Sequence, residues 1–408
     1  MTGRSLSAWL ERLETLHPSN IELGLERVGS VAQALKCHQF DCPVVTVAGT
    51  NGKGSSCAVL EAMAKNSGKR VGVFSSPHLM RYNERVRING LQVDDHDLVE
   101  VFELIDSARG TTKLTYFEFG ALAALQLFQQ AELDLVILEV GLGGRLDAVN
   151  IVDADIAVIT SIALDHEDWL GSTRETIAVE KAGILRRGIT AVVADLDPPQ
   201  SLLKAVDDMG CRLLSVIDAD VPQWVPDRVR AENYQAAWLV ARELGFAPSL
   251  QSMQGLEEAL VLPGRLQRME LGKKVLLLDV AHNQAAVENL VFYLNRGGHI
   301  RARALFAALS DKDIHAMIRS CSGVFEEWHV CDLPNVPRAL NAREIASVLT
   351  EQGERVSSTS GDPATALHRA IEGDGAGPLV VVFGSFFTVA GVLEELEQGQ
   401  AALGDQSA

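Results

Sequence analysis

The sequence Val44-Val45-Thr46-Val47-Ala48-Gly49-Thr50-Asn51-Gly52-Lys53-Gly54-Ser55 joins an apolar, β-branched run to a glycine-rich turn that carries one lysine. A helical pattern follows the turn directly. Glycines let successive backbone N–H groups converge on an anion, and the N-terminus of the following helix adds a positive end. The order of strand, glycine turn and helix therefore predicts a phosphate-binding loop, and it favours this interpretation over a glycine turn that merely lies beside a lysine.

The loop is a variant of the GxxxxGK[ST] pattern. Val47 stands where the first glycine belongs, and Gly54 separates Lys53 from Ser55. The chemistry is kept, because a lysine at this place reaches the outer phosphates and a nearby hydroxyl serves Mg²⁺.

The composition indicates a globular chain without nucleic-acid or membrane partners. Its 408 residues are 47% hydrophobic and 22% charged, and this length suits two or three domains. Lysine and arginine number 36 against 54 aspartates and glutamates, so the formal net charge is −18. An acidic field of this size repels nucleic acid and acidic membranes, so an anionic substrate needs local cationic groups.

The cysteines and the first residues predict a soluble, cytoplasmic protein. The 6 cysteines are scattered without a CxxC pair, which is typical of reduced thiols rather than of a disulfide framework or a zinc site. Residues 1–20 mix charges with a helical pattern and hold no long apolar run, so we expect neither a signal peptide nor a membrane span.

Strand-like and helical segments alternate along the chain, which predicts an α/β fold. Strand-like runs cover 44–48, 70–74, 135–140, 156–160 and 191–194, and a helical stretch covers 119–131. Buried parallel strands are continuously apolar, as 133–138 largely is, and ligands gather at the carboxyl ends of such strands.

A second alternation predicts a separate, smaller α/β domain. It comprises a strand at 275–280, a helix from Gln284, and strands at 302–306 and 379–383. Proline and glycine interrupt the helical pattern at 263–272, so we place the domains at 1–268 and 269–408.

Polar residues at or after the ends of three of the strands predict a metal site. Ser76 follows the strand at 70–74, Glu139 lies at the end of the strand at 135–140, and His166 ends the loop after the strand at 156–160. A carboxylate, a hydroxyl and an imidazole together suit Mg²⁺. Each has a plainer alternative: a turn residue for the serine, a salt bridge for the glutamate and a hydrogen-bonded structural group for the histidine.

A set of motifs, taken in order, closely resembles folylpolyglutamate synthases, which are relatives of the Mur ligases. The motifs are Gly49-Thr50-Asn51-Gly52-Lys53-Gly54-Ser55, Ser76-Pro77-His78, Glu139-Val140-Gly141-Leu142-Gly143-Gly144-Arg145-Leu146-Asp147, Leu164-Asp165-His166, Glu180-Lys181-Ala182-Gly183-Ile184, Pro263-Gly264-Arg265 and Asp279-Val280-Ala281-His282-Asn283. The resemblance implies a P-loop NTPase-like N-terminal domain with a mostly parallel sheet, which carries the ATPase, metal and pterin sites, and a smaller Rossmann-like C-terminal glutamate-ligase domain.

The resemblance also implies the activity. These enzymes use ATP to join a substrate carboxylate to the amino group of L-glutamate through an acyl phosphate. Many bacterial members act both on 7,8-dihydropteroate, giving dihydrofolate, and on reduced folates, giving polyglutamates. We expect this bifunctional form, working as a monomer on these small molecules.

Site residues follow from the resemblance position by position. It places Thr50, Asn51, Gly52, Lys53, Gly54 and Ser55 at the ATP phosphates, Asn233 at the adenine, Arg265, Asp279 and His282 at the nucleotide from the junction and second domain, and Ser76, Glu139 and His166 on Mg²⁺. Lys181 matches a lysine that is carbamylated in the family, where the new carboxylate serves a second Mg²⁺. We expect Lys53, Lys181 and His166 to be the catalytic residues.

The pterin site is expected on three short segments. The matching positions are Glu22, Leu23, Gly24, Leu25, Thr115, Tyr116, Phe117, Glu118, Leu146, Asp147 and Ala148. Phe117 offers a flat apolar face to the ring, and the Asp147 carboxylate can accept two hydrogen bonds from the aminopyrimidinone edge. Packing and a loop cap are the alternative roles of these two residues.

Other functions stay open at this point. Gln284 stands where the family commonly has proline, so the contact at His282 is the least certain of the set. A ligase for one folate acceptor and a Mur-type enzyme for a cell-wall nucleotide share the same chemistry. A regulatory NTPase is the alternative of another class, and the set Asn233, Arg265 and Asp279 argues against it.

Overall fold

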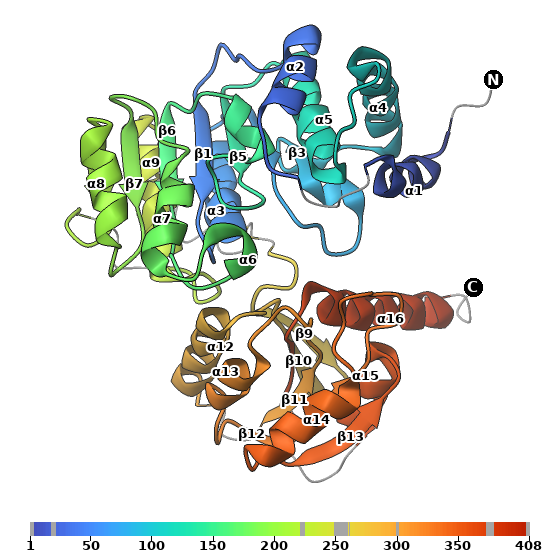
Figure 1. Ribbon diagram of the computed structural model, residues 1–408. Helices are drawn as coiled ribbons and strands as arrows, with labels where there is room; N and C mark the ends of the chain where they lie inside the picture. The colour runs from blue at the N-terminus through green and yellow to red at the C-terminus, as the bar shows by residue number, and fades with distance from the viewer. Residues whose placement is uncertain are drawn as a thin grey trace. The chain divides into compact units, whose positions relative to one another are not determined.

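The computed structural model describes residues 4–17, 22–220, 225–248, 260, 262–298, 302–372 and 379–404 (Figure 1). The chain divides into two compact units, Met1–Val261 and Leu262–Ala408. The division comes a few residues before the boundary expected from the sequence, because strand β9 (Gln267–Leu271) pairs antiparallel with β10 (Lys274–Leu278) and so belongs to the second unit.

The first unit is built on an eight-stranded sheet in the order β4-β3-β2-β5-β1-β6-β7-β8. Its strands are β1 (Val44–Ala48), β2 (Val71–Phe74), β3 (Val86–Ile88), β4 (Leu91–Gln92), β5 (Leu135–Glu139), β6 (Ile156–Ile159), β7 (Thr190–Val193) and β8 (Arg212–Ser215). The strands from β2 to β8 in this order are parallel, and β3 and β4 extend one edge antiparallel. The mostly parallel sheet of the sequence prediction is thus confirmed.

Helices cover both faces of this sheet (Figure 1). They are α1 (Leu6–Leu16), α2 (Glu26–Leu35), α3 (Lys53–Asn66), α4 (Asp95–Arg109), α5 (Tyr116–Gln130), α6 (Glu167–Leu170), α7 (Arg174–Ala182), α8 (Gln200–Asp208) and α9 (Ala231–Glu243), with short 3₁₀ turns η1 (Tyr82–Arg85) and η2 (Ala148–Ile151). Helix α3 packs against α9, and α7 packs against α8. Every residue of β1 and of β5 is buried, as continuous apolar runs between two helical layers require.

Helix α5 begins three residues earlier than the apolar pattern suggested. Thr115 caps the helix through its hydroxyl, which accepts from the N–H of Glu118, while the Glu118 carboxylate accepts from the N–H of Thr115. This reciprocal capping box satisfies N–H groups that the helix itself leaves without partners. The local cap therefore sets the start of the helix at Tyr116.

The second unit has a six-stranded sheet in the order β13-β12-β11-β14-β10-β9. Its further elements are β11 (Ala302–Phe306), β12 (Phe325–Cys331), β13 (Val356–Ser360), β14 (Leu379–Phe383), α12 (Gln284–Arg296), α13 (Ile314–Arg319), α14 (Ala342–Glu351), α15 (Pro363–Glu372) and α16 (Phe386–Gly404). All pairs are parallel except β9 with β10. The predicted strands at 302–306 and 379–383 have the bounds expected. Strand β9 falls within the segment 263–272, where the sequence predicts the domain junction, because this edge strand is half-exposed and charged and so lacks an apolar pattern.

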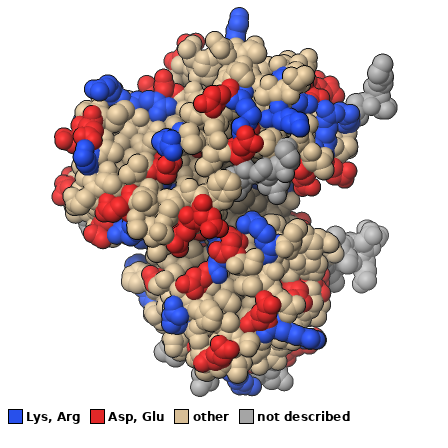
Figure 2. Space-filling model, viewed as in Figure 1, with Lys and Arg blue, Asp and Glu red and all other residues tan. Residues whose placement is uncertain are grey.

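The surface carries charges of both signs. On the face shown in Figure 2, lysine and arginine side chains lie interspersed with aspartates and glutamates, without a large basic field. Within the described residues, no helix is both long enough and apolar enough to cross a membrane.

Candidate active site

The glycine-rich loop follows β1 and wraps into the first turn of α3. Gly52 caps this helix with φ +90°, a conformation that side chains disfavour. At Gly49, with φ +153°, an added Cβ would lie 1.6 Å from Thr160 Oγ1. The two glycines therefore let the loop approach the neighbouring strand end and leave its concave side to the backbone, as a phosphate cradle requires.

Lys53 is the first residue of α3 and lies over the loop. Its Nζ donates to the carbonyl oxygens of Gly49 (2.9 Å) and Thr50 (3.1 Å). Carbonyl groups of the loop thus hold the ammonium close to the loop backbone. A phosphate oxygen bound there can replace these carbonyl groups.

The segment after β6 holds the loop from the other side. Thr50 N donates to Ser161 O (2.7 Å), Thr50 Oγ1 donates to Ala163 O (3.1 Å), and Ser161 Oγ donates to Asn51 O (3.1 Å). These bonds fix the conformation of the loop before any ligand binds, which lowers the entropy that binding must overcome.

Asn233 lies directly against the phosphate loop, although it comes far along the chain on α9. Its side chain is 6% exposed, and a Cβ on Gly52 would lie 2.3 Å from its Oδ1. The structure thus brings the predicted adenine residue and the predicted phosphate residues into one place within the first unit.

The predicted metal ligands lie at one edge of the sheet. Ser76 N donates to Glu139 Oε2 (3.1 Å), so the ends of β2 and β5 are joined there. Glu139 is 2% exposed, and His166 follows β6 immediately before α6 with φ +53°. A buried carboxylate beside a serine, at the edge where an imidazole also follows a strand, is a donor set that fits Mg²⁺.

Lys181, on α7, is a buried lysine whose ammonium form is disfavoured. It is 3% exposed, and burial, followed by the positive charge of Lys53, lowers its pKa well below the usual 10.5, although Asp165 and Asp147 act in the opposite direction. No group of the described chain accepts a hydrogen bond from its Nζ. A neutral amine in this setting is a nucleophile.

Asp147 serves as a cap for its own loop, which was the alternative to a pterin contact. Its Oδ2 accepts from the N–H groups of Gly141 (3.0 Å) and Leu142 (2.9 Å), and its Oδ1 accepts from that of Val149 (3.1 Å). Burial raises the pKa of the carboxyl to about 6 against the effect of these bonds and of Lys53. Since a carboxylate has about four acceptor positions, one position on Oδ1 stays available to a ligand.

The other predicted pterin residues form a wall beside this loop. The Phe117 ring lies 5.7 Å from the Phe74 ring and covers Gly141, where a Cβ would lie 2.5 Å from it. Arg27 joins the remaining segments, because it pairs with both Glu22 and Glu118. The structure thereby gathers the segments at 22–25, 115–118 and 146–148 around the end of β5.

The predicted nucleotide residues of the second unit lie where β10 ends. Asp279 accepts from the N–H groups of Leu266 (2.9 Å) and Ala281 (2.8 Å), and burial raises the pKa of its carboxyl while Arg265 and His282 lower it. His282 Nδ1 lies 2.8 Å from Val280 O and donates to this carbonyl oxygen, which fixes the orientation of the ring. Gln284 opens α12 at the position where proline is favoured, so its presence leaves the start of this helix intact.

Arg85 was missed by the sequence interpretation, which included His78 only as part of the motif Ser76-Pro77-His78 and gave it no role. Arg85 Nε donates to His78 Nδ1 (2.8 Å), and the guanidinium lies over the rings of Tyr82 (5.3 Å) and Tyr116 (5.5 Å). Burial and the Arg85 charge lower the pKa of His78 to about 4. The only sequence signal was the position of Arg85 just after Ser76-Pro77-His78, which does not distinguish it from a surface arginine.

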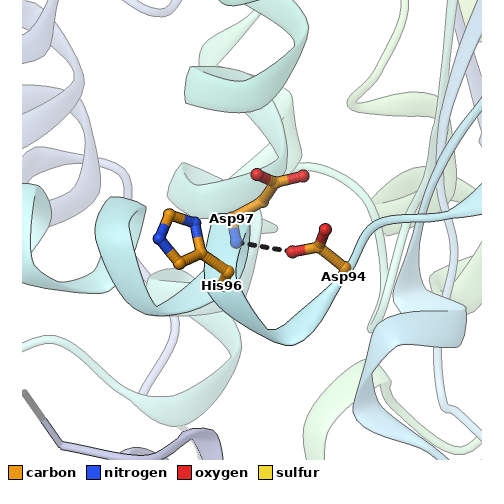
Figure 3. Close-up of side chains that lie close together, drawn as sticks. All are labelled: Asp94, His96 and Asp97. Atoms are coloured by element: carbon orange, nitrogen blue, oxygen red, sulfur yellow. Dashed lines mark hydrogen bonds between the residues drawn. The ribbon is translucent and has the colours of Figure 1, made fainter.

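A group of potential metal ligands also lies away from this site. Asp94, His96 and Asp97 bring their ligand atoms within 4.8 Å of one another at the start of α4 (Figure 3), but all three are exposed. Asp94 caps the helix, because its Oδ1 accepts from Asp97 N (2.9 Å). A cavity of about 440 Å³ adjoins the group and is lined by Arg81, Asn83, Gln92, Val93, Asp94, Asp95 and His96. Because Asp94 acts as the helix cap and all three side chains are exposed, this group does not indicate an ion site.

Comparisons with known proteins identify the class first. The Mur ligase middle domain matches residues 47–220, and the Mur ligase, glutamate ligase domain matches residues 264–386. The matched ranges contain the phosphate loop, Ser76, Glu139, Lys181 and Asp279. The chain is therefore a Mur-type ligase.

Relatives of known name then give the family. The dihydrofolate synthase/folylpolyglutamate synthase of Escherichia coli K12 is 41% identical over 96% of both chains, and that of Haemophilus influenzae is 39% identical over 94% of this chain and 96% of its own. The structure of E. coli FolC in complex with DHPP and ADP superimposes with a TM-score of 0.88 at 39% identity, covering 97% of this chain and 99% of that one. The Yersinia pestis bifunctional enzyme complexed with AMPPNP and Mn ion gives 0.88 at 43% identity, covering 97% and 98%. The chain belongs to the dihydrofolate synthase/folylpolyglutamate synthase family, which confirms the resemblance seen in the sequence.

Proposed function

We propose that the protein is a bifunctional ligase that uses ATP to join L-glutamate to 7,8-dihydropteroate and to reduced folates, releasing ADP and phosphate. One observation carries the proposal: the phosphate loop, Asn233, the Ser76–Glu139 pair and Lys181 lie around the carboxyl edge of one sheet. Relatives with this fold were solved with DHPP and ADP, and with Mn, AMPPNP and L-glutamate. Those ligands are the classes that the proposed reaction needs.

The chemistry assigned to the chain is activation of a carboxylate. The substrate carboxylate oxygen attacks the γ-phosphorus of ATP and ADP leaves, which gives an acyl phosphate. The amine of glutamate then attacks the acyl carbon, phosphate leaves, and the nitrogen loses a proton as the amide forms. Lys53 stabilises the negative charge of the transferring phosphoryl group, and the N–H groups of the loop position it.

Ser76, Glu139 and His166 hold the divalent metal in this proposal. When bound, the metal neutralises phosphate charge and orients the phosphates for in-line transfer. The position of Glu139 supports the assignment, because its carboxyl group is buried at the end of β5 and accepts a hydrogen bond from the N–H of Ser76 (3.1 Å).

Lys181 is proposed to be carbamylated. Its neutral amine adds to CO₂, which forms an N–C bond and releases one proton, and the product is a carboxylate that can bind a second metal ion. Three observations support this: burial lowers the pKa of the amine, no described group accepts a hydrogen bond from Nζ, and the positive charge of Lys53 acts on this site.

Phe117, Asp147 and the segments at 22–25, 115–118 and 146–148 form the proposed pterin site. The pterin ring packs on Phe117, and the remaining acceptor position on Asp147 Oδ1 takes one N–H of the aminopyrimidinone edge. This is one bond fewer than expected from the sequence, because three backbone N–H groups already occupy the carboxylate.

For the second unit we propose Arg265, Asp279 and His282 as nucleotide contacts. The hydrogen bonds of Asp279 tie the Arg265-Leu266 turn to β10 and thereby orient the arginine. We further propose that the enzyme works as a monomer in the cytoplasm, where its six free cysteines stay reduced.

An acceptor panel with labelled glutamate tests the function. Dihydropteroate and tetrahydrofolate should each support glutamate-dependent ADP release and a labelled amide product, while a UDP-linked peptide should support neither. Activity with only one folate acceptor would establish a monofunctional enzyme instead. Nucleotide hydrolysis that is equally fast without any acceptor would contradict the ligase and favour a regulatory NTPase.

A further inference from the structure

Arg85 is a buried cation for which the described chain supplies no anion. The residue is 8% exposed and lies at the end of η1. Its Nε donates to His78, but no described carboxylate pairs with it, and no described group accepts from Nη1 or Nη2. Neither Nη atom is among the fully enclosed polar atoms that lack a partner, so both can reach a ligand. Burying a charge without a partner is costly, which points to an anionic ligand.

His78 adds a further donor to the same place. An arginine N–H can only donate, so Nδ1 of His78 is the accepting nitrogen and Nε2 of the ring carries the proton. Arg85 therefore sets the tautomer of the histidine. The Nη1 and Nη2 groups of Arg85 form a planar fork of donors that suits the two oxygens of a carboxylate, and the Nε2–H of His78 is a further donor nearby.

An arginine close to Arg85 in the sequence does have a carboxylate partner. Arg87, two residues further on, donates to Glu61 Oε2 through Nε (2.9 Å) and Nη2 (2.8 Å). The acid next to Arg85 in sequence, Glu84, is engaged elsewhere, because it accepts from the N–H groups of residues 79, 80 and 81. Arg85 therefore differs from Arg87 in having no carboxylate partner among the described residues.

The position of Arg85 indicates which anion it serves. Ser75 N donates to Arg85 O (2.9 Å), so the arginine lies beside the segment that carries Ser76, at the proposed metal site. Tyr116, whose ring contacts the guanidinium, directly precedes Phe117 of the proposed pterin wall. Arg85 thus adjoins both the segment of the proposed metal site and the segment of the proposed pterin wall.

The two proposed acceptors differ in the number of carboxylate groups that they carry. Dihydropteroate has one carboxylate, which must react. A folate that already carries glutamate has two, and one of them stays free while the other reacts. We propose that Arg85 and His78 form a subsite for this free carboxylate, so that they serve the extension of folates and not the first addition of glutamate; this inference rests on the proposed function.

The test compares acceptors in the wild type and in Arg85→Met, which keeps an apolar stem between the two tyrosine rings. Kinetics are measured with dihydropteroate, with tetrahydrofolate, and with the tetrahydrofolate mono-amide whose reactive carboxylate is free. The expected result is a KM for tetrahydrofolate that rises at least about tenfold in the variant, while the values for dihydropteroate change little. The wild type should prefer tetrahydrofolate over the mono-amide, and Arg85→Met should lose that preference.

Controls separate binding from structure. Arg81→Gln removes a nearby exposed arginine and should leave both activities unchanged. Arg85→Lys keeps the charge and should retain part of the preference, which also covers the case in which Arg85→Met fails to fold. Equal losses with both acceptors, or a wild type that uses the mono-amide as well as tetrahydrofolate, would overturn the inference. Absence of ligation with every acceptor in the wild type would instead refute the proposed function.

Discussion

Replacing Lys53 by alanine should remove catalysis while the fold survives. In the structure, Nζ donates hydrogen bonds to the carbonyl oxygens of Gly49 and Thr50 in its own loop. At about 0.5–1.5 kcal/mol each, their loss costs at most about 3 kcal/mol of folding free energy. A domain of this size loses about 2–4 °C of Tm per kcal/mol, so a folded variant is expected at assay temperature.

The catalytic loss should be much larger than the structural one. A pre-organised group that stabilises developing charge contributes about 100- to 1,000-fold to kcat, which equals about 2.7–4 kcal/mol of transition-state stabilisation. The assay is glutamate-dependent ADP release with dihydropteroate, run beside a thermal melt of the same preparation. Lys65→Ala, on an exposed residue in the last turn of the same helix, is the matched control and should keep full activity.

Two results with Lys53→Ala would contradict the proposed role of the lysine. A folded Lys53→Ala variant that keeps more than about a tenth of the wild-type rate would show that the lysine is not the cation of phosphoryl transfer. Loss of activity together with loss of the cooperative melt would show that the lysine holds the loop rather than the nucleotide.

Three further predictions address the metal, the pterin and the buried lysine. Glu139→Ala should abolish ligation and weaken Mn²⁺ binding in the presence of nucleotide, as measured by titration with paramagnetic detection, and unchanged Mn²⁺ affinity would remove this residue from the metal site. Asp147→Ala should reduce the use of dihydropteroate more than folate extension in parallel assays, whereas equal losses would indicate that the residue acts only as the loop cap seen in its three backbone bonds. Lys181→Met should abolish ligation and yet stabilise the ligand-free protein at neutral pH, because the folded-state pKa lies well below the 10.5 of the unfolded chain and the unfolded chain alone binds a proton between these values. Lys181 thus makes the free energy of unfolding rise with pH up to about 10.5, and denaturant titrations at several pH values should show a shallower rise in the variant; an unchanged slope would contradict the buried neutral amine.

Local patterns in the sequence determined the elements and the identity of the reacting groups. The strand at 44–48 and the phosphate loop after it were readable because a parallel strand covered on both faces is apolar at every position, and because a turn over an anion needs glycine. Ser76, Glu139 and His166 were predicted as metal ligands for a related reason, since polar side chains at the carboxyl ends of parallel strands meet at one edge of the sheet. The strand at 267–271 was not predicted, because an edge strand with exposed charges lacks the apolar pattern of a buried strand.

Only the tertiary structure decided how these groups behave. The packing of Asn233 on Gly52, the lowered pKa of Lys181 and the lack of a carboxylate beside Arg85 among the described residues all depend on segments distant in sequence. The same holds for Asp147, whose carboxylate is largely occupied by its own loop. Periodicity and turn chemistry are properties of neighbouring residues, whereas burial, charge compensation and free hydrogen-bonding capacity arise only when separate segments pack together.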